Sequence, residues 1–435
     1  MSPCVRREMR SAAIGAVGLV GACWVSGCSA GQGIGDSEDL TDGGGGSGCD
    51  IGGTLYASGA TAHDGCEVCT PGTSTTAWTD SVSSCNSGAG TCFSGSCVMP
   101  ASCQTSTSGT TNCGPGGTGS ESCCTSLEVE GGTYFRTYDP LGVDGGPVLA
   151  ADGGPSGEAD PATVSNFRLD KYLVTVGRFR QFVAAWNKGS GYYPSAGSGK
   201  HIHLNLGQGL ANSASAGTYE TGWDATDWNN ATDIDPTDDN LTSGTSGSCT
   251  GYATWTPTDT GGQENLPINC VTWWEAYAFC IWDGGFLPSE AEWEYAAAAG
   301  NQQREYPWGS TALGTACPGT GCDYAIYRCY YPSGPGGCTS VSNIAPVGYA
   351  SNGAGYFGQL DLAGEMWEWN LDWYNSTYVD SGTDCAYLPT TPASYRVARG
   401  GGFNFGAAVL LPPNRDGGDP AYRGNYGGFR CARTP

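Results

Sequence analysis

The sequence predicts an α+β fold with little regular secondary structure, preceded by a small disulfide-rich module. Glycine accounts for 72 of the 435 residues, well above its usual share of about 7%, so loops should dominate. Three short segments in the C-terminal two-thirds combine a capping residue with apolar residues at helical spacing. The segment from Cys49 to Cys124 concentrates ten cysteines among few large apolar residues, which is typical of a module held together by cross-links.

The N-terminus has the layout of an export signal. A basic start is followed by an apolar stretch over residues 11–25, which is too short to span a membrane. The small residues before Cys28 resemble a bacterial lipobox, so we expect residues 1–27 to be a lipoprotein signal peptide and Cys28 to be lipidated. An ordinary cleaved signal with an incidental cysteine is the alternative. Ser29 in place of Asp implies, by the same resemblance, the outer membrane of the cell envelope.

Composition divides the mature chain into three parts. Residues 28–48 are rich in Gly, Ser and Asp and should form a flexible tether. Residues 49–125 form the cysteine-rich module, whose even cysteine count fits five bridges of undetermined pairing. Residues 126–435 are expected to be one larger domain. Removing Cys4, Cys23 and Cys28 from the 22 cysteines leaves an odd number, and Cys385 or Cys249 is the expected unpaired thiol.

The charge excludes several partners. A formal net charge of -24 gives no electrostatic footprint for nucleic acid or for an anionic lipid surface, so the membrane should be contacted through the lipid anchor alone. The same charge is compatible with cations such as Ca²⁺, although a plain secreted surface explains it equally. Only three histidines occur, so a zinc framework would need all-cysteine sites, and disulfides account better for the cysteines.

The predicted helices begin at recognisable caps. Thr175 can cap a helix that carries apolar residues through Trp186. Thr272 with Glu275, and Ser289 with Glu292, form two capping boxes, each followed by an apolar helical pattern. We expect the acidic residues of the third helix, Glu290 among them, to serve in capping and surface salt bridges.

Several longer motifs occur in a fixed order from about Leu127 to Pro435. They are Phe167-Arg-Leu-Asp-Lys-Tyr, Pro267-Ile-Asn-Cys-Val-Thr-Trp-Trp-Glu-Ala-Tyr-Ala-Phe-Cys280, Leu287-Pro-Ser-Glu-Ala-Glu-Trp, Tyr306-Pro-Trp-Gly, Leu360-Asp-Leu-Ala-Gly-Glu-Met-Trp-Glu-Trp, Arg399-Gly-Gly-Gly-Phe and Gly428-Phe-Arg-Cys431. Together they resemble the formylglycine-generating enzyme, or sulfatase-modifying factor, family. The resemblance implies a variant of the C-type-lectin-like fold.

The resemblance also implies a disulfide and a metal site. Cys280 and Cys431 match cysteines that pair in the family's eukaryotic members. Closing so long a loop would stabilise the fold by about 4–5 kcal/mol on the chain-entropy account. The family's calcium ligands match the side chains of Asp361 and Glu368.

Backbone carbonyls of Gly364 and Met366 complete that implied calcium set. Carboxylate and carbonyl oxygens suit Ca²⁺. A solvated Asp and a Glu paired to an Arg are the alternative.

The family's oxidase chemistry requires two cysteines that bind Cu(I), because thiolates select that ion. Here the two positions fall on Phe405 and Leu410, and the serine of the preceding motif is Gly402. We therefore do not expect copper or active formylglycine-generating catalysis. The family's iron-dependent sulfoxide synthases need three histidine ligands, whereas His201 and His203 are expected here to be a solvent-exposed pair.

The predicted function is a cell-envelope lipoprotein whose family domain lacks the copper cysteines and acts as a non-catalytic binding or scaffold protein. Its partner would be a peptide, a glycan or an envelope protein. The alternatives are an oxidase that converts a target cysteine to formylglycine, an enzyme using other residues, and an inert structural head.

Overall fold

The computed structural model describes most of the chain beyond residue 48. The described residues are 49–51, 54–56, 60, 66–68, 79–80, 84–85, 88–93, 96–140, 156–258, 262–314, 320–379 and 382–435. The expected signal peptide, Cys28 and the tether lie outside them.

The helices are short, and the three predicted ones are present. The α-helices are α1 (Val176–Trp186), α2 (Asp238–Ser243), α3 (Trp273–Trp282), α4 (Glu290–Ala297) and α5 (Thr320–Asp323). The 3-10 helices are Ala101–Cys103, Asn187–Gly189, Asn205–Gly207, Thr245–Gly247, Gly300–Gln302, Val341–Asn343, Ser351–Gly353 and Ala407–Val409. Among the described residues, no helix combines the length and apolar character needed to cross a membrane.

The capping predictions are confirmed. The Thr175 side chain accepts a hydrogen bond from the backbone N–H of Arg178 at the start of α1. Both capping boxes are complete, at the first turns of α3 and α4. A cap of this kind contributes about 1 kcal/mol because it satisfies N–H groups that have no partner within the helix.

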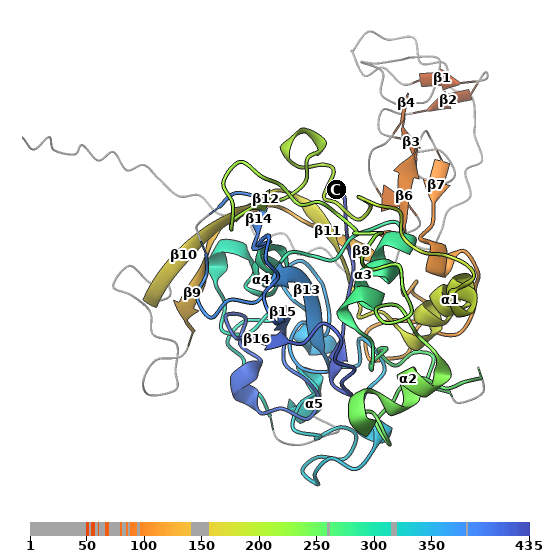
Figure 1. Cartoon of the computed structure of the whole chain (residues 1–435), viewed down its shortest axis with the longest axis vertical. Coiled ribbons are helices and arrows are strands. Elements are labelled where there is room, and N and C mark those ends of the chain that lie inside the picture. The colour runs from red at the N-terminus through yellow and green to blue at the C-terminus, as the bar shows by residue number, and fades with distance from the viewer. Residues whose placement is uncertain are drawn as a thin grey trace, which may run out of the picture. The chain divides into compact units, whose positions relative to one another are not determined.

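A four-stranded sheet lies at the centre of the domain (Figure 1). Its strand order is β16 (Arg415–Gly418), β15 (Arg396–Arg399), β13 (Trp367–Trp373) and β17 (Gly427–Gly428). Strand β13 pairs antiparallel with β15 and parallel with β17. Helices α3 and α4 both contact β13, which is why nearly every residue of this strand is buried.

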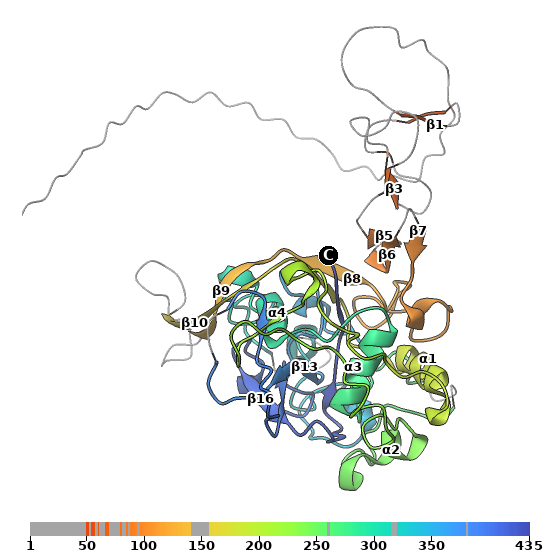
Figure 2. The ribbon, with the colours of Figure 1, turned by 45° about the horizontal axis from the view of Figure 1, so that its top comes forward.

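Within the described residues, three smaller sheets complete the domain, and Figure 2 shows the long β9–β10 ribbon from a second direction. They are β18–β11–β8 (Ala432–Arg433, Phe167–Asp170, Ser126–Val129), β9–β10 (Gly132–Asp139, Ser156–Val164) and β12–β14 (Ala211–Asn212, Cys385–Ala386). Strand β11 pairs with β18 through Leu169 and Ala432, so the C-terminal segment is built into the fold beside the domain's first strands.

The largest core cluster is aromatic. Phe179 and Phe182 of α1 pack on Phe279 of α3, and Phe279 in turn packs on Phe429 near the C-terminus. Cys280 and Cys431 lie in the same cluster and form a disulfide across 151 residues of chain. The core and this covalent bond together join α3 to the C-terminal segment.

The cysteine-rich module consists of short antiparallel strands. They are β1 (Cys49–Ile51), β2 (Thr54–Tyr56), β3 (Glu67–Val68), β4 (Thr79–Asp80), β5 (Ser84–Cys85), β6 (Gly90–Phe93) and β7 (Ser96–Val98). The described disulfides of the module are Cys66–Cys92, Cys85–Cys97, Cys103–Cys124 and Cys113–Cys123. The sequence had left this pairing open.

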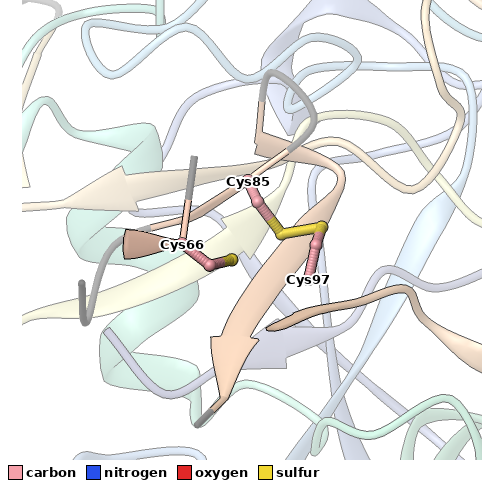
Figure 3. Close-up of side chains that lie close together, drawn as sticks. All are labelled: Cys66, Cys85 and Cys97. Carbon is pink, nitrogen blue, oxygen red and sulfur yellow. A yellow bond between two sulfur atoms is a disulfide. The ribbon is translucent and has the colours of Figure 1, made fainter. Parts of the chain in front are cut away.

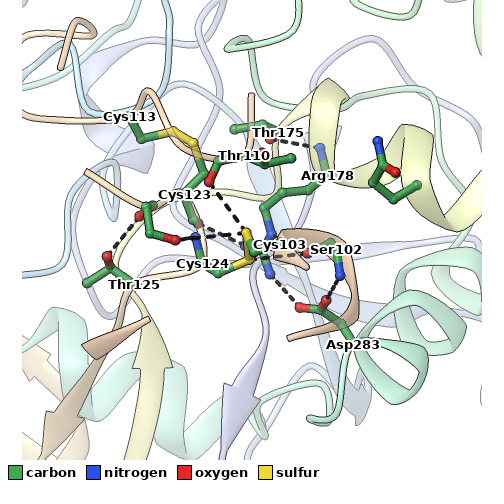
Figure 4. Close-up of a disulfide and its surroundings, with 12 residues drawn as sticks. Ser102, Cys103, Thr110, Cys113, Cys123, Cys124, Thr125, Thr175, Arg178 and Asp283 are labelled. Carbon is green, nitrogen blue, oxygen red and sulfur yellow. Dashed lines mark hydrogen bonds and ion pairs between the residues drawn. A yellow bond between two sulfur atoms is a disulfide. The ribbon is translucent and has the colours of Figure 1, made fainter. Parts of the chain in front are cut away.

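The last part of the module is joined to α1 by buried charge, as Figure 4 shows. Beside the Cys103–Cys124 disulfide, the Ser102 hydroxyl accepts a hydrogen bond from Arg178 Nε at 3.0 Å. Arg178 donates from Nη2 to Asp283 at 2.6 Å, and the Ser102 backbone N–H donates to the same carboxylate at 2.8 Å. The module and the domain therefore share one polar network at this junction.

Candidate functional site

The candidate site is the glycine turn that follows β15. Gly400 and Gly401 have φ of 96° and 77°, a region that residues with a side chain rarely adopt. A Cβ at Gly400 would also lie 3.2 Å from the Trp293 ring. The turn therefore requires glycine, and it directs the chain toward Phe403 and Phe405.

The two positions expected to lack copper ligands are filled by hydrocarbon. The Phe405 ring packs edge-on against Trp367 and Tyr426, with centroid distances of 5.7 Å and 5.2 Å. Leu410 is 1% exposed and lies in a separate apolar cluster with Tyr306 and Tyr327. Neither side chain can donate an electron pair to a metal ion.

A cavity of about 60 Å³ lies beside this turn. Its lining comprises Trp367, Trp369, Ala398, Asp416, Gly417, Gly418, Tyr422, Gly424, Tyr426 and Gly427. Burial, followed by the hydrogen bond with Tyr422, raises the pKa of Tyr426 to about 12, so this phenol stays protonated at neutral pH. Among the described residues, no cysteine, histidine or methionine lines the cavity, and the lining residues do not fit Cu(I).

Buried ion pairs between the strands β15 and β16 and helix α4 hold the residues next to the turn. Arg399 donates from Nε to Glu290 at 2.9 Å and from Nη2 to Glu294 at 2.8 Å. Arg415 holds the same Glu290 carboxylate with two hydrogen bonds of 2.7 and 2.6 Å. The acids of α4 are buried, not surface groups as the sequence had suggested. The reason is that α4 packs against β13 and β15 on one side and against β9 and β10 on another.

Glu294 carries an unusual proton affinity. Burial raises its pKa to about 7, although the charge of Arg399 acts in the opposite direction. Its Oε1 has no hydrogen-bond partner among the described residues. Its other oxygen, Oε2, accepts hydrogen bonds from Tyr378 and Arg399, so Glu294 helps to hold Arg399 before the turn. Glu294 does not line the cavity.

The expected calcium ligands are brought close together, but one of them has another partner. Glu368 is fully buried, and Arg430 donates to its two carboxylate oxygens at 2.7 and 2.8 Å. Each Glu368 oxygen therefore already accepts one hydrogen bond from Arg430. The Gly364 carbonyl accepts a hydrogen bond from the Met366 N–H at 2.8 Å within the tight loop before β13.

The same loop carries a further carboxylate, Glu365, whose titration responds to the charge of Asp361. Asp361 Oδ2 accepts from the Gly348 N–H at 2.7 Å, and Glu365 Oε1 accepts from the Ala345 N–H at 2.9 Å. Glu365 is 1% exposed and its Oε2 has no partner among the described residues. Burial, and then the charge of Asp361, raises the pKa of Glu365 well above its ordinary value. Glu365 could be suspected from the sequence only through its place between two expected ligands, Gly364 and Met366.

The histidine pair differs from its prediction. His201 is fully buried, with Nδ1 3.1 Å from Glu220 and Nε2 3.1 Å from Glu292. His203 lies nearby, and neither of its ring nitrogens has a described partner. The expectation of an exposed pair is therefore wrong, because the Phe286 ring and α4 cover the loop that carries both residues.

A cluster of three cysteine sulfurs is also explained without a metal. The sulfurs of Cys66, Cys85 and Cys97 lie within 4.8 Å of one another. Figure 3 shows that Cys85 and Cys97 share a disulfide, and Cys66 is bonded to Cys92. Oxidised sulfurs are not thiolate ligands, so the cluster is a pair of neighbouring cross-links.

One part of the odd-cysteine prediction is wrong. Cys249 is bonded to Cys270, which brings the loop after α2 to the segment just before α3. Cys385 is buried in β14. The sequence offered no way to distinguish these two cysteines because pairing depends on which loops meet in space.

The α+β architecture, the glycine turn and the Trp367-Glu-Trp strand together define a lectin-like domain of the formylglycine-generating type. Residues 122–435 match the family model described as "Sulfatase-modifying factor enzyme 1-like domain". The chain therefore belongs to this family.

Individual relatives match this chain over only part of its length. The formylglycine-generating enzyme of Streptomyces coelicolor is 34% identical over 180 residues, covering 40% of this chain and 54% of the relative. A mouse protein named "Inactive C-alpha-formylglycine-generating enzyme 2" is 32% identical over 169 residues, covering 39% and 49%. The solved structure of PvdO from Pseudomonas aeruginosa is 19% identical, with a TM-score of 0.44, and the match covers 71% of this chain and 94% of PvdO. The chain spans about half the length of the curated relatives it matches.

The buried histidine predicts a pH-dependent stability. Burial acts to lower the pKa of His201, but the charges of Glu292 and Glu220 together raise it to about 10. The folded protein thus keeps a proton that the unfolded chain releases above about pH 6.5. The stability from this pair should be complete below that pH and lost as the pH rises through about 10.

His201→Gln should therefore lower the free energy of unfolding by about 3–5 kcal/mol at pH 6, and the difference from the wild type should shrink toward pH 10. Thermal melts from pH 6 to pH 10 would measure this. His203→Gln is the control: because burial lowers the pKa of His203, this ring is neutral in both states above about pH 7, and its removal should leave the slope there unchanged. Parallel curves for the wild type and His201→Gln would contradict the assignment.

Proposed function

We propose that this chain is a cell-envelope lipoprotein whose family domain binds a partner without catalysing formylglycine formation. The observation that carries the proposal is the occupation of the two copper positions by Phe405 and Leu410. The Phe405 ring packs between Trp367 and Tyr426, so it supports the turn by contact. A relative that is itself named inactive supports the view that this fold persists without the chemistry.

An oxidase assay tests the non-catalytic part. Purified protein would be incubated with a cysteine-containing sulfatase peptide, Cu(I) and O₂, and the peptide analysed by mass spectrometry for the aldehyde. We expect no product above background, because the cavity offers no soft ligand. The Streptomyces coelicolor enzyme serves as the positive control. Aldehyde formed by the wild type at a comparable rate would establish the oxidase alternative.

The lipid anchor is proposed from residues 25–28 and the basic, apolar segment before them. In a Gram-negative host, Cys28→Ala should move the protein from the membrane fraction to the soluble fraction, because the acyl chains on that thiol are the proposed attachment. Fractionation followed by immunoblotting measures the shift. Cys23→Ala, within the apolar segment, is the matched control and should stay membrane-bound. Wild-type protein found only in the soluble fraction would refute the anchor.

We further propose that the loop before β13 holds Ca²⁺ through the side chains of Asp361 and Glu365, with backbone carbonyls of Gly364 and Met366. Glu365 would replace Glu368, whose two oxygens already contact Arg430. The support is the unpartnered Oε2 of Glu365, a buried hard ligand beside a second carboxylate. Bound Ca²⁺ would neutralise the two like charges.

Calcium should accordingly raise the melting temperature of the wild type by several degrees over the value in chelator. Glu365→Gln should lose most of that rise, and in chelator it should melt at or above the wild type because a buried repulsion is removed. Differential scanning fluorimetry measures both effects. Glu130→Gln, at an exposed position, is the control. An equal calcium-induced rise in Glu365→Gln and Glu130→Gln would exclude the proposed ligand.

A further inference from the structure

One buried arginine lies away from the glycine turn and lacks the carboxylate partner that five other buried arginines have. Arg178, Arg399, Arg423, Arg430 and Arg433 each form ion pairs with carboxylates. Arg396, at the start of β15, is 3% exposed and forms no ion pair with any described residue. Its charge is therefore buried without a compensating anion, which costs several kcal/mol in general unless something else offsets it.

The contacts of Arg396 leave part of its guanidinium unused. The group lies between the rings of Trp273 and Trp373, 3.6 Å from each centroid. Nη1 donates to the Leu371 carbonyl at 2.6 Å, and Nε has no partner among the described residues. Stacking on both faces holds the plane of the guanidinium in place, so the orientation of its edge is defined before any ligand arrives.

Asp372, the acid whose charge acts on Arg396, does not fill this role. Asp372 accepts a hydrogen bond from the Glu290 N–H at one oxygen and from the Tyr387 N–H at the other, both at 2.7 Å. Burial lowers the pKa of Arg396 well below its ordinary value, with only weaker opposing effects from Tyr277 and Asp372. The Arg396 charge therefore has no compensating carboxylate among the described residues, because Asp372 is already held by two backbone N–H groups.

Arg396 lines a cavity of about 470 Å³, a size typical of sites for small molecules. Aromatic and apolar side chains form much of its wall: Trp228, Trp273, Tyr277, Leu371, Trp373, Leu388, Pro389 and Pro392. The polar groups of the wall are Asn212, Thr218, Glu220, Thr221, Thr390 and Arg396. The cavity at the glycine turn shares none of these residues, so the two are separate sites.

The charges of the wall restrict the ligand. Arg396 favours a carboxylate, whose two oxygens match the fork of a guanidinium. Glu220 is already held by His201 and by the Leu210 N–H, but it still disfavours a second negative group. The net charge of -24 likewise disfavours a polyanion. A monoanion with a ring that can lie against tryptophan satisfies all three conditions.

From this geometry we propose that the cavity between β13, α3 and the segment 388–396 binds a ring-bearing monocarboxylate, with its carboxylate on Arg396 and its ring against Trp273, Tyr277 or Trp373. Two sources share this chemistry, a hexuronic acid and an aromatic acid. The proposal deepens the binding role proposed above and in that sense rests on it. It does not involve the copper positions. A failed binding assay would therefore contradict only this proposal, whereas a positive oxidase assay would contradict the non-catalytic function.

Titration calorimetry on the full chain tests the proposal, with glucuronate against glucose and benzoate against benzyl alcohol. Saturable binding of at least one acid, with no detectable binding of its neutral partner, is the expected result. Arg396→Met should weaken that binding by about ten- to a hundredfold. Arg304→Gln is the matched control, since Arg304 also lies over an aromatic ring, 5.2 Å from Tyr356, but outside the cavity.

A second variant covers the case in which Arg396→Met does not fold. Thr390 lines the cavity and is exposed, so Thr390→Trp should fold and block the cavity, and binding of the acid should be lost. Quenching of tryptophan fluorescence by the acid should disappear in the same variant. Absence of binding for both acids would overturn the proposal, as would equal affinity for acid and neutral partner or unchanged affinity in Thr390→Trp.

Discussion

The fold depends on arginine side chains that are buried against carboxylates from distant parts of the chain. Arg178 bridges Asp170 and Asp283, and Arg433 contacts the same two acids from the C-terminal strand. In a domain with short helices and long loops, few backbone ladders join these segments. A buried ion pair that has lost one partner is strongly destabilising, so each such contact requires that its loops come together in one arrangement.

Buried arginine–carboxylate pairs also hold the glycine turn and the loop before β13. Arg399 is fixed by Glu290 and Glu294 directly before the glycine turn, so the turn is held in place independently of any metal. Arg430 contacts Glu368 through both oxygens, whereas Glu365 Oε2 has no partner among the described residues. The support of the family's site is therefore retained, while the two positions that would carry its copper chemistry are apolar. A fold can outlast a particular reaction because packing and catalysis rest on different residues.

Arg396 is informative because it departs from this pattern. It is buried as deeply as its paired counterparts, but two indole rings stand where the others have a carboxylate. Aromatic stacking offsets part of the cost of burying a charge and leaves the hydrogen-bonding edge incomplete. A guanidinium with unused N–H donors beside a large cavity is expected where a bound ligand supplies the anion.

Features that depend on neighbours along the chain could be predicted before the structure was known. The caps at Thr175, Thr272 and Ser289 were predictable because a cap needs only a side chain and an N–H two or three positions away. The family and its α+β fold followed from motifs in order, and so did the absence of cysteine at Phe405.

Which distant groups meet could not be predicted from local patterns, because it depends on how the loops pack. The burial of His201 between two glutamates, the pairing of Cys249 with Cys270 and the cavity around Arg396 all join segments far apart in sequence. A histidine or an arginine has the same local signal whether it is solvated or buried. Its role is set by burial and by the charges around it, and these exist only once the loops have packed.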